Sequence, residues 1–204
     1  MRLNTEFGAD LRWWVTFMEI WNGVSIVSAL CRRPVDAWLT SDASGSWGCG
    51  AYFYRKWFNI SWEVCQSWTE VHIAAKELLP IVISCALWGQ QMKSFHIRCR
   101  CDNAAVVTMI NKHTSRHPVA AHLLRCLFFI CAKYSISLSA EHLPGCLNTA
   151  ADALSRGNEL AFHQAVPYAQ TSPCTIPADL LMVLIHRRPN WLSAEWSKAF
   201  QLCL

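Results

Sequence analysis

The stretch LTSDASGSWGCGAYFY, Leu39 to Tyr54, decides the fold of this chain. It indicates two short β-strands joined by a turn rich in Ser and Gly. Strands of this kind normally bury apolar side chains, yet Asp42 stands at the end of the first one. A buried ionised carboxylate costs several kcal/mol unless it is paired or binds a metal, so the position of Asp42 requires an explanation.

The quoted stretch belongs to a predicted β-meander of three strands. The strands are expected in VDAWLTSDAS, SWGCGAYFY and KWFNISWEV, within residues 35–64. A helix is predicted next, from about Thr69 to Trp88, with Thr69 or Ser67 as its N-cap.

Two more strands and three more helices follow. SFHIRCRCD and ISLSAEHL are expected to be the strands, and residues 103–111, 117–133 and 148–156 the helices. The order β-β-β-α-β-α-α-β-α implies an antiparallel meander that is extended by parallel strands returning through helices. The predicted fold class is therefore α/β, with a five-stranded mixed sheet flanked by helices.

Composition excludes several classes of protein. The chain has 204 residues, of which 53% are hydrophobic and 16% charged, and this favours one globular domain with terminal appendages. The net charge of +4 permits a polyanionic partner without requiring one. The 11 Cys form no small-domain disulfide framework and no secretory pattern is present, so an intracellular location, in the cytoplasm or the nucleus, is expected. No run approaches the roughly 18 apolar residues of a membrane span, so no membrane association is expected.

Four acidic residues stand in otherwise apolar neighbourhoods. Asp42 ends the first strand, Glu77 lies in the first long helix, Asp102 ends the fourth strand, and Asp152 lies in the last helix. Because the first and fourth strands are expected to be neighbours in the sheet, their carboxyl ends would bring Asp42 and Asp102 side by side. Clustered carboxylates repel one another, and a divalent cation removes that penalty.

The residue types favour magnesium or manganese as the cation. Hard oxygen ligands without a matched set of His or Cys select Mg²⁺ or Mn²⁺ rather than zinc. Cys99 and Cys101 are expected to pack in the core, because no second Cys pair at ligand spacing is present. Two ions about 4 Å apart could activate a water molecule and stabilise the leaving oxygen of a phosphodiester. Metal-assisted phosphodiester hydrolysis is the expected reaction.

Four motifs in a fixed order resemble the ribonuclease H domain of retrotransposon reverse transcriptases. They are TSDAS with WGCGAY, KELLPI, CDNAAVV and HLPGCLNTAADALSR, and they span Val35 to Arg156. The resemblance is closest to the DIRS-like elements, the retrotransposons that carry a tyrosine recombinase. LRWWVTFMEIWNGVSIV also resembles the connection between polymerase and nuclease in these elements, and IPADLLMVLIHRRPNW resembles the stretch downstream of the nuclease.

The resemblance divides the chain into three parts. Residues 1–34 would be a connection segment from the reverse transcriptase, residues 35–157 the ribonuclease H-like domain, and residues 158–204 a linker and a short helical C-terminal segment. It implies that the polymerase domain is a partner, carried in the same polyprotein.

The resemblance also implies a ribonuclease H-like fold and an endonuclease. Its substrate would be the RNA strand of an RNA–DNA hybrid, hydrolysed by two-metal catalysis with Mg²⁺ or Mn²⁺. The metal-binding carboxylates of the family match Asp42, Glu77, Asp102 and Asp152. Asp42 would bridge both ions, Glu77 and Asp102 would hold the first, and Asp152 would hold the second.

Four further residues are candidates for substrate contact. Asn148 matches an Asn of the family that contacts substrate. In cellular members a His follows the Gly of a longer loop and helps the product to leave, whereas here Cys146 follows the Gly and His142 lies near. Ser44 and Asn103, each beside a motif acid, have turn or cap formation as one interpretation and substrate contact as the other.

Several alternatives remain open at the level of sequence. Five cations could either track phosphates or belong to a solvated surface: Arg98, Arg100, Lys112, Arg116 and Arg156. The same fold could also be a catalytically silent tether or scaffold that holds nucleic acid or the polymerase. A third possibility is a nuclease or integrase of this fold that acts on DNA.

Overall fold

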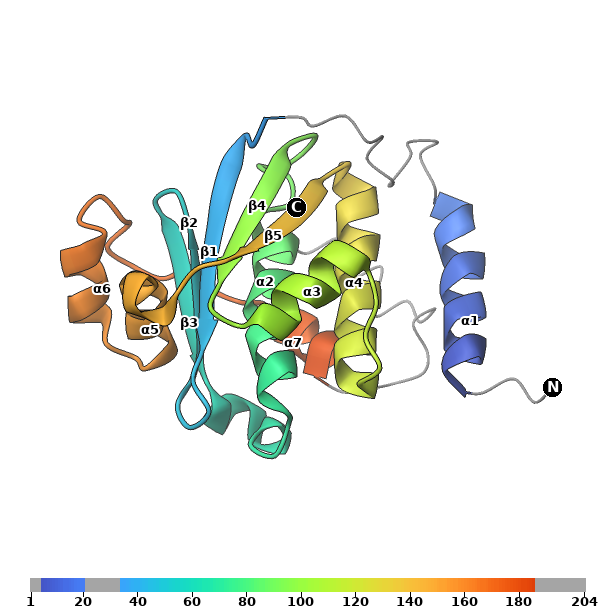
Figure 1. Cartoon of the computed structure of the whole chain (residues 1–204), viewed down its shortest axis with the longest axis horizontal. Coiled ribbons are helices and arrows are strands. Elements are labelled where there is room, and N and C mark those ends of the chain that lie inside the picture. Colours follow the sequence, from blue (N-terminus) through green and yellow to red (C-terminus); the bar gives the residue numbers. More distant parts are fainter. Residues whose placement is uncertain (1–4, 21–33, 186–204) are drawn as a thin grey trace.

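The computed structural model describes residues 5–20 and 34–185, and its centre is a five-stranded sheet (Figure 1). The strands are β1 (Ala37–Ala43), β2 (Gly48–Phe53), β3 (Lys56–Ser61), β4 (His96–Cys101) and β5 (Ser137–His142), in the spatial order β3-β2-β1-β4-β5. β1, β2 and β3 form the antiparallel meander, and β4 and β5 continue the sheet parallel to β1. The predicted fold class, α/β with a five-stranded mixed sheet flanked by helices, is confirmed.

Helices cover both faces of the sheet (Figure 1). One side carries α2 (Ile73–Trp88), α3 (Ala104–Lys112), α4 (Pro118–Tyr134) and α7 (Ala178–Ile185); the other carries α5 (Thr149–Ser155) and α6 (Glu159–Ala165). α1 (Thr5–Ile20) contacts α4, where Asp10 Oδ1 lies 2.7 Å from Arg125 Nε. None of the helices in the described part of the chain is both long and apolar enough to cross a membrane.

The main core lies between the sheet and α2. This helix is buried along nearly its whole length, and Leu78 and Ile81 are completely inaccessible, as are Leu39 of β1 and Ile97 of β4. A smaller apolar cluster on the other face packs Leu154 of α5 against side chains of β3 and α6. The core under α2 holds β1 and β4 in place, and the ends of these two strands position the candidate site.

The predicted start of the first long helix is wrong. α2 begins at Ile73, and its N-cap is His72, whose ring Nδ1 accepts a hydrogen bond from the Ala74 N–H at 3.2 Å. The preceding residues form a 3₁₀ helix, Trp62–Trp68, in which both Trp side chains are buried and stack 6.2 Å apart. The need to bury both indoles takes precedence over the capping preference of Thr69 or Ser67.

The segment expected to be a linker runs along the edge of β3. The Gln170 N–H donates to the Arg55 carbonyl at 2.7 Å, and the Cys174 N–H donates to the Trp57 carbonyl at 2.8 Å. Further on, two Leu side chains of α7 are fully buried in the main core. The remaining parts of the predicted connection and C-terminal segments, residues 1–4, 21–33 and 186–204, lie outside the described residues.

α5 packs tightly against the sheet at Gly50 of β2. A Cβ atom there would lie 2.5 Å from Leu154 Cβ and 3.0 Å from the Phe58 carbonyl oxygen. We expect Gly50→Ala to destabilise the fold by about 1–3 kcal/mol, because α5 must move outward to make room. Urea denaturation measures this difference.

The matched control is Gly45→Ala, in the turn between β1 and β2. No atom lies within 4 Å of a Cβ at Gly45, so this variant should change the free energy of unfolding by less than about 1 kcal/mol. Equal stability of the two variants would contradict the close packing of α5 on β2.

Candidate functional site

Two of the predicted acids meet at one edge of the sheet. Asp42 is the last residue but one of β1, and Asp102 directly follows β4. The two strands are parallel, with Thr40 opposite Arg100. Two residues further on, Asp42 and Asp102 therefore end neighbouring strands at the same edge, as the sequence predicts.

Glu77 joins this pair from α2. Its Oε2 accepts a hydrogen bond from the Ala43 N–H at 3.1 Å and lies 3.9 Å from the sulfur of Cys101. One ligand atom each from Glu77, Cys101 and Asp102 lies within 4.8 Å of the other two. Three elements thus bring acids together, and we call this place, defined by Asp42, Glu77 and Asp102, the acidic edge.

Burial and mutual repulsion raise the pKa of two of these carboxyl groups. Burial is the larger cause for Glu77, the negative charges of Asp42 and Asp102 add to it, and its pKa rises to about 9. Burial, with the charges of Asp102 and Asp152, raises the pKa of Asp42 to about 6. Both groups are at most 5% exposed. Ionising these carboxyl groups is therefore unfavourable in the free protein, and a bound divalent cation would stabilise their ionised form.

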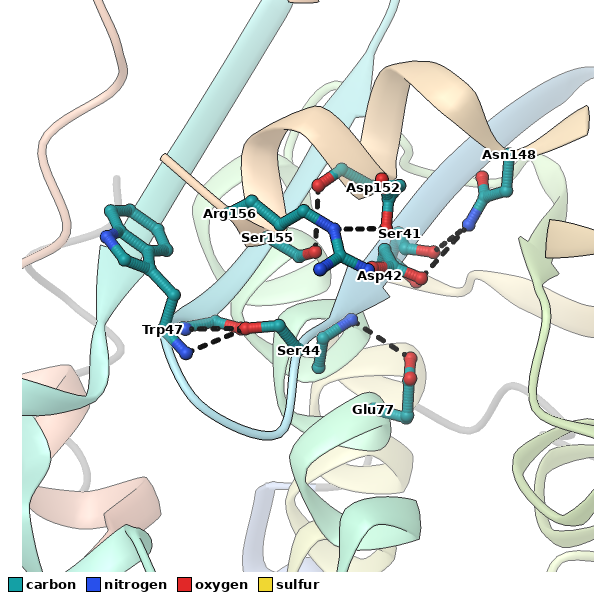
Figure 2. A network of polar contacts seen from close by, with 11 residues as sticks. Ser41, Asp42, Ser44, Trp47, Glu77, Asn148, Asp152, Ser155 and Arg156 are labelled. Carbon is teal, nitrogen blue, oxygen red and sulfur yellow. Dashed lines mark hydrogen bonds and ion pairs between the residues drawn. The ribbon is translucent and has the colours of Figure 1, made fainter. Parts of the chain in front are cut away.

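Asp152 approaches the acidic edge from α5. Its Oδ1 lies 2.8 Å from Nε of Arg156, one helical turn further on, and the two side chains are 43% and 63% exposed. Figure 2 shows the Arg156 guanidinium beside both Asp152 and Asp42. The charge of Arg156 lowers the pKa of Asp42, and the pair with Asp152 raises the pKa of Arg156. The fourth predicted acid therefore lies next to Asp42 and has a cation of its own.

Asn148 contacts the acidic edge from the N-terminal end of α5. Its side chain is 2% exposed, and its Nδ2 donates to the Ser41 carbonyl at 3.1 Å and to Asp42 Oδ1 at 3.3 Å (Figure 2). The Oδ1 of Asn148 is buried and has no hydrogen-bond partner among the described residues. The structure thus gives Asn148 a role in orienting Asp42, and its contact with substrate stays a prediction.

His142, the last residue of β5, is exposed beside the acidic edge. Its Nε2 lies 3.0 Å from the backbone carbonyl oxygen of Asp102. This places an imidazole within reach of a substrate bound at Asp102, and its role in substrate contact or product release stays a prediction.

Ser44 and Asn103 have clear structural roles. The Oγ of Ser44 accepts hydrogen bonds from the N–H groups of Trp47 and Gly48, at 2.9 and 3.0 Å, and so closes the turn between β1 and β2 (Figure 2). Oδ1 of Asn103 accepts from two N–H groups of the first turn of α3, as an N-cap does. Turn and cap formation are therefore observed for both residues, and substrate contact stays a prediction.

Sequence reasoning missed the second role of Cys101. The prediction that Cys99 and Cys101 pack in the core is confirmed, since both are fully buried. However, the thiol of Cys101 also lies against the Glu77 carboxylate, and its sulfur accepts the Asn103 N–H at 3.3 Å. The signal was its position directly before Asp102, on the strand face that α2 covers.

Lys76 was also missed, and it holds the turn beside the acidic edge. It is 3% exposed, and its Nζ donates to the carbonyls of Gly45 at 2.8 Å and Thr69 at 2.9 Å, over the ring of Trp62.

We expect Lys76→Met to destabilise the fold by about 2–3 kcal/mol, because two charge-assisted hydrogen bonds are lost and two carbonyl groups lose their donor. Urea denaturation measures it, and Lys112→Met, at an exposed lysine of α3, should change little. An equal effect of the two substitutions would contradict the anchoring role.

Comparison with known proteins finds solved structures of low sequence identity, among them two RNase H proteins. No protein-family model and no curated protein matches the sequence. The chain is similar to the N-terminal RNase H domain of a Mycobacterium tuberculosis protein fused to maltose-binding protein, with 13% identity over 64% of this chain and 99% of that one and a TM-score of 0.44. It is also similar to RNase H1 from the halophilic archaeon Halobacterium salinarum, with 13% identity over 60% of this chain and 96% of that one and a TM-score of 0.47. The fold assignment itself rests on the strand order and pairing of this chain.

Proposed function

We propose that this chain, built on a ribonuclease H-like fold, is a metal-dependent endonuclease that hydrolyses the RNA strand of RNA–DNA hybrids. The observation that carries the proposal is the acidic edge: Asp42, Glu77 and Asp102 come together from separate parts of the chain, and burial with the neighbouring negative charges raises the pKa of Asp42 and Glu77. Buried carboxyl groups this close together are unfavourable to ionise without a bound cation. Carboxyl groups with shifted pKa values of this kind cluster at functional sites.

The carboxylates present suit Mg²⁺, with Mn²⁺ as an alternative, and the proposal is that two ions bind there. The donors are carboxylate oxygens, which both cations prefer, and Asp42, Glu77, Asp102 and Asp152 would hold them. Bound ions would supply an activated water molecule and stabilise the leaving oxygen of the phosphodiester.

The chain's own groups hold the acids in position before any ligand arrives. The Ala43 N–H fixes one oxygen of Glu77, and the Asn148 amide fixes one oxygen of Asp42. Arg156 pairs with Asp152 across one helical turn and offsets one negative charge beside the acidic edge. Preorganisation of this kind lowers the cost of assembling a reactive geometry.

The wider context is proposed from the ordered motifs between Val35 and Arg156. The chain would be part of the reverse transcriptase of a DIRS-like retrotransposon and would work inside the cell. Residues 1–34 would connect the nuclease to its polymerase partner, residues 35–157 would form the nuclease domain, and residues 158–204 would form the linker and helical C-terminal segment.

Comparing four labelled substrates tests the reaction. With Mg²⁺ present, we expect the full chain to cut the RNA strand of an RNA–DNA hybrid and to leave duplex DNA, duplex RNA and single strands intact. Cleavage of duplex DNA would show instead a DNA-acting nuclease. Binding of the hybrid without any cleavage, with Mg²⁺ or Mn²⁺, would show a catalytically silent scaffold.

A further inference from the structure

One face of the sheet carries aromatic and basic side chains next to the acidic edge. Side chains alternate along a strand, so Trp38 and Asp42 of β1 point to the same face, and Arg98 and Arg100 lie together on β4. α5 packs on this face over β1, β2 and β3 (Figure 1). The part over β4 and β5 stays accessible: the side chains of Arg98 and Arg100 are 36% and 37% exposed.

The strand register gathers four residues into a block. Trp38 of β1 is opposite Arg98 of β4, and Arg100 is opposite Glu141 of β5. We call this block, Trp38, Arg98, Arg100 and Glu141, the Trp38 face. Trp38 and Asp42 are four residues apart on β1. Because a strand rises by about 3.3 Å per residue, Trp38 lies about 13 Å along the strand from the acidic edge.

The contacts within the Trp38 face leave it with a positive charge. The guanidinium carbon of Arg100 lies 3.7 Å from the centroid of the Trp38 ring, and that of Arg98 lies 5.7 Å from it. Both cations share one carboxylate: Arg100 Nε is 2.9 Å and Arg98 Nη1 is 3.7 Å from the oxygens of Glu141. The Trp38 side chain is 38% exposed, whereas Trp57, Trp62, Trp68 and Trp88 are buried.

We propose that the Trp38 face binds a single-stranded continuation of the RNA strand that the acidic edge holds. Arg98 and Arg100 would contact its phosphates, and Trp38 would stack on a base. The inference rests on the proposed function, since it takes RNA to be the strand at the acidic edge.

Charge and geometry favour a single strand as the occupant. Phosphates complement the excess positive charge, and an exposed indole can stack only on bases whose faces are free, which a duplex does not offer. A stacked strand advances about 3.4 Å per nucleotide, so about four nucleotides would cover the distance from Asp42 to Trp38. No base-specific donors or acceptors are required, so we expect binding without sequence preference.

The test compares a blunt RNA–DNA hybrid with hybrids that carry an RNA extension. The extension is about four to six nucleotides long, the length needed to reach Trp38, and is placed at the 5′ or the 3′ end. Fluorescence anisotropy measures binding in Mg²⁺, with Asp102→Asn present in every protein so that the substrate is not cut. We expect one of the two extended hybrids to bind more tightly than the blunt one.

Three variants of the Trp38 face should then change binding in different directions, two of them weakening it and one tightening it. Trp38→Ala should weaken binding of the extended hybrid by at least about fivefold, the loss of one base stacked on an aromatic ring. Arg98→Gln with Arg100→Gln should reduce the slope of log affinity against log salt by about 1.4, which corresponds to two phosphate contacts on a single strand. Glu141→Gln should tighten binding, because it removes the competing carboxylate and keeps the shape of the side chain.

Blunt hybrid and a remote arginine supply the controls. Binding of the blunt hybrid should be the same for all these variants, and Arg55→Gln, in the turn between β2 and β3, should change nothing. Equal binding of blunt and extended hybrids by the parent protein, or weaker binding after Glu141→Gln, would overturn the inference. Failure of the proposed function would be seen separately, as an absence of cleavage of every hybrid by the chain that retains Asp102.

Discussion

Asp102→Asn is expected to abolish cleavage of an RNA–DNA hybrid, with a fall in rate of at least about 10³-fold. Asp102 supplies one of the ligand atoms that lie within 4.8 Å of one another at the acidic edge. A metal site of this kind provides several kcal/mol of transition-state stabilisation, and about 1.4 kcal/mol corresponds to a tenfold change in rate. Asn has the same shape but lacks the negative charge that binds a divalent cation. Single-turnover cleavage of a labelled hybrid measures the loss.

The fold should survive this substitution. Asp102 is partly exposed and lies after the end of β4, so no ladder hydrogen bond depends on its side chain. In the absence of metal, the melting temperature of the variant should therefore be no lower than that of the parent protein, because one negative charge is removed from the acidic edge. Glu63→Gln, at an exposed residue of the 3₁₀ helix, is the matched control and should keep full activity. An Asp102→Asn protein that cuts the hybrid at the parent rate would refute the assignment.

The metal-free protein is expected to lose stability as the pH rises, and Glu77 is the main cause. The pKa of Glu77 rises from 4.5 to about 9 on folding, mainly through burial. Between these values the folded protein retains a proton that the unfolded chain has released, so raising the pH favours unfolding. The slope for one proton is about 1.4 kcal/mol per pH unit. The pKa of Asp42 rises from 3.8 to about 6, so Asp42 adds to the loss only over that lower window.

Glu77→Gln separates this contribution from those of other groups. The amide can still accept the hydrogen bond from Ala43 N–H but does not titrate. From pH 6 to 9, above the range of Asp42, the parent should lose stability relative to the variant. Urea denaturation at each pH, in the presence of a chelator, gives the two curves. Parallel curves would show that Glu77 is ionised in the folded protein.

Divalent cations should reverse this trend. A cation binds the ionised carboxylates, so its stabilising effect grows as the pH rises and protons leave Glu77 and Asp42. The gain in unfolding free energy with Mg²⁺ should therefore be larger at pH 9 than at pH 6 for the parent, and small at both for Glu77→Gln. A gain that is the same at both pH values would point to binding away from these two acids.

The sheet and the convergence of the acids could be predicted because they follow from local patterns. Alternation in SFHIRCRCD predicted the buried face of β4, and the order of elements predicted that β1 and β4 are neighbours. Once those strands are parallel, the positions of Asp42 and Asp102 are set by their place at the strand ends. Turn and cap chemistry likewise indicated the roles of Ser44 and Asn103.

Other features depend on tertiary packing that no local pattern encodes. α2 begins at Ile73 rather than at Thr69, because the preceding segment forms a 3₁₀ helix that buries two Trp side chains in the core. Lys76 can be buried because its ammonium group donates hydrogen bonds to two carbonyl groups from separate segments, those of Gly45 and Thr69. The pairing of Asp152 with Arg156 is the exception, since their spacing of four residues on one helix is visible in the sequence.

Anomalous diffraction from crystals soaked in Mn²⁺ tests most directly whether the four carboxylates bind a pair of metal ions. We predict two manganese peaks, one within bonding distance of Asp42, Glu77 and Asp102, and the other between Asp42 and Asp152. Manganese that binds elsewhere on the protein, with no peak at these four carboxylates under conditions in which the hybrid is cut, would contradict the account.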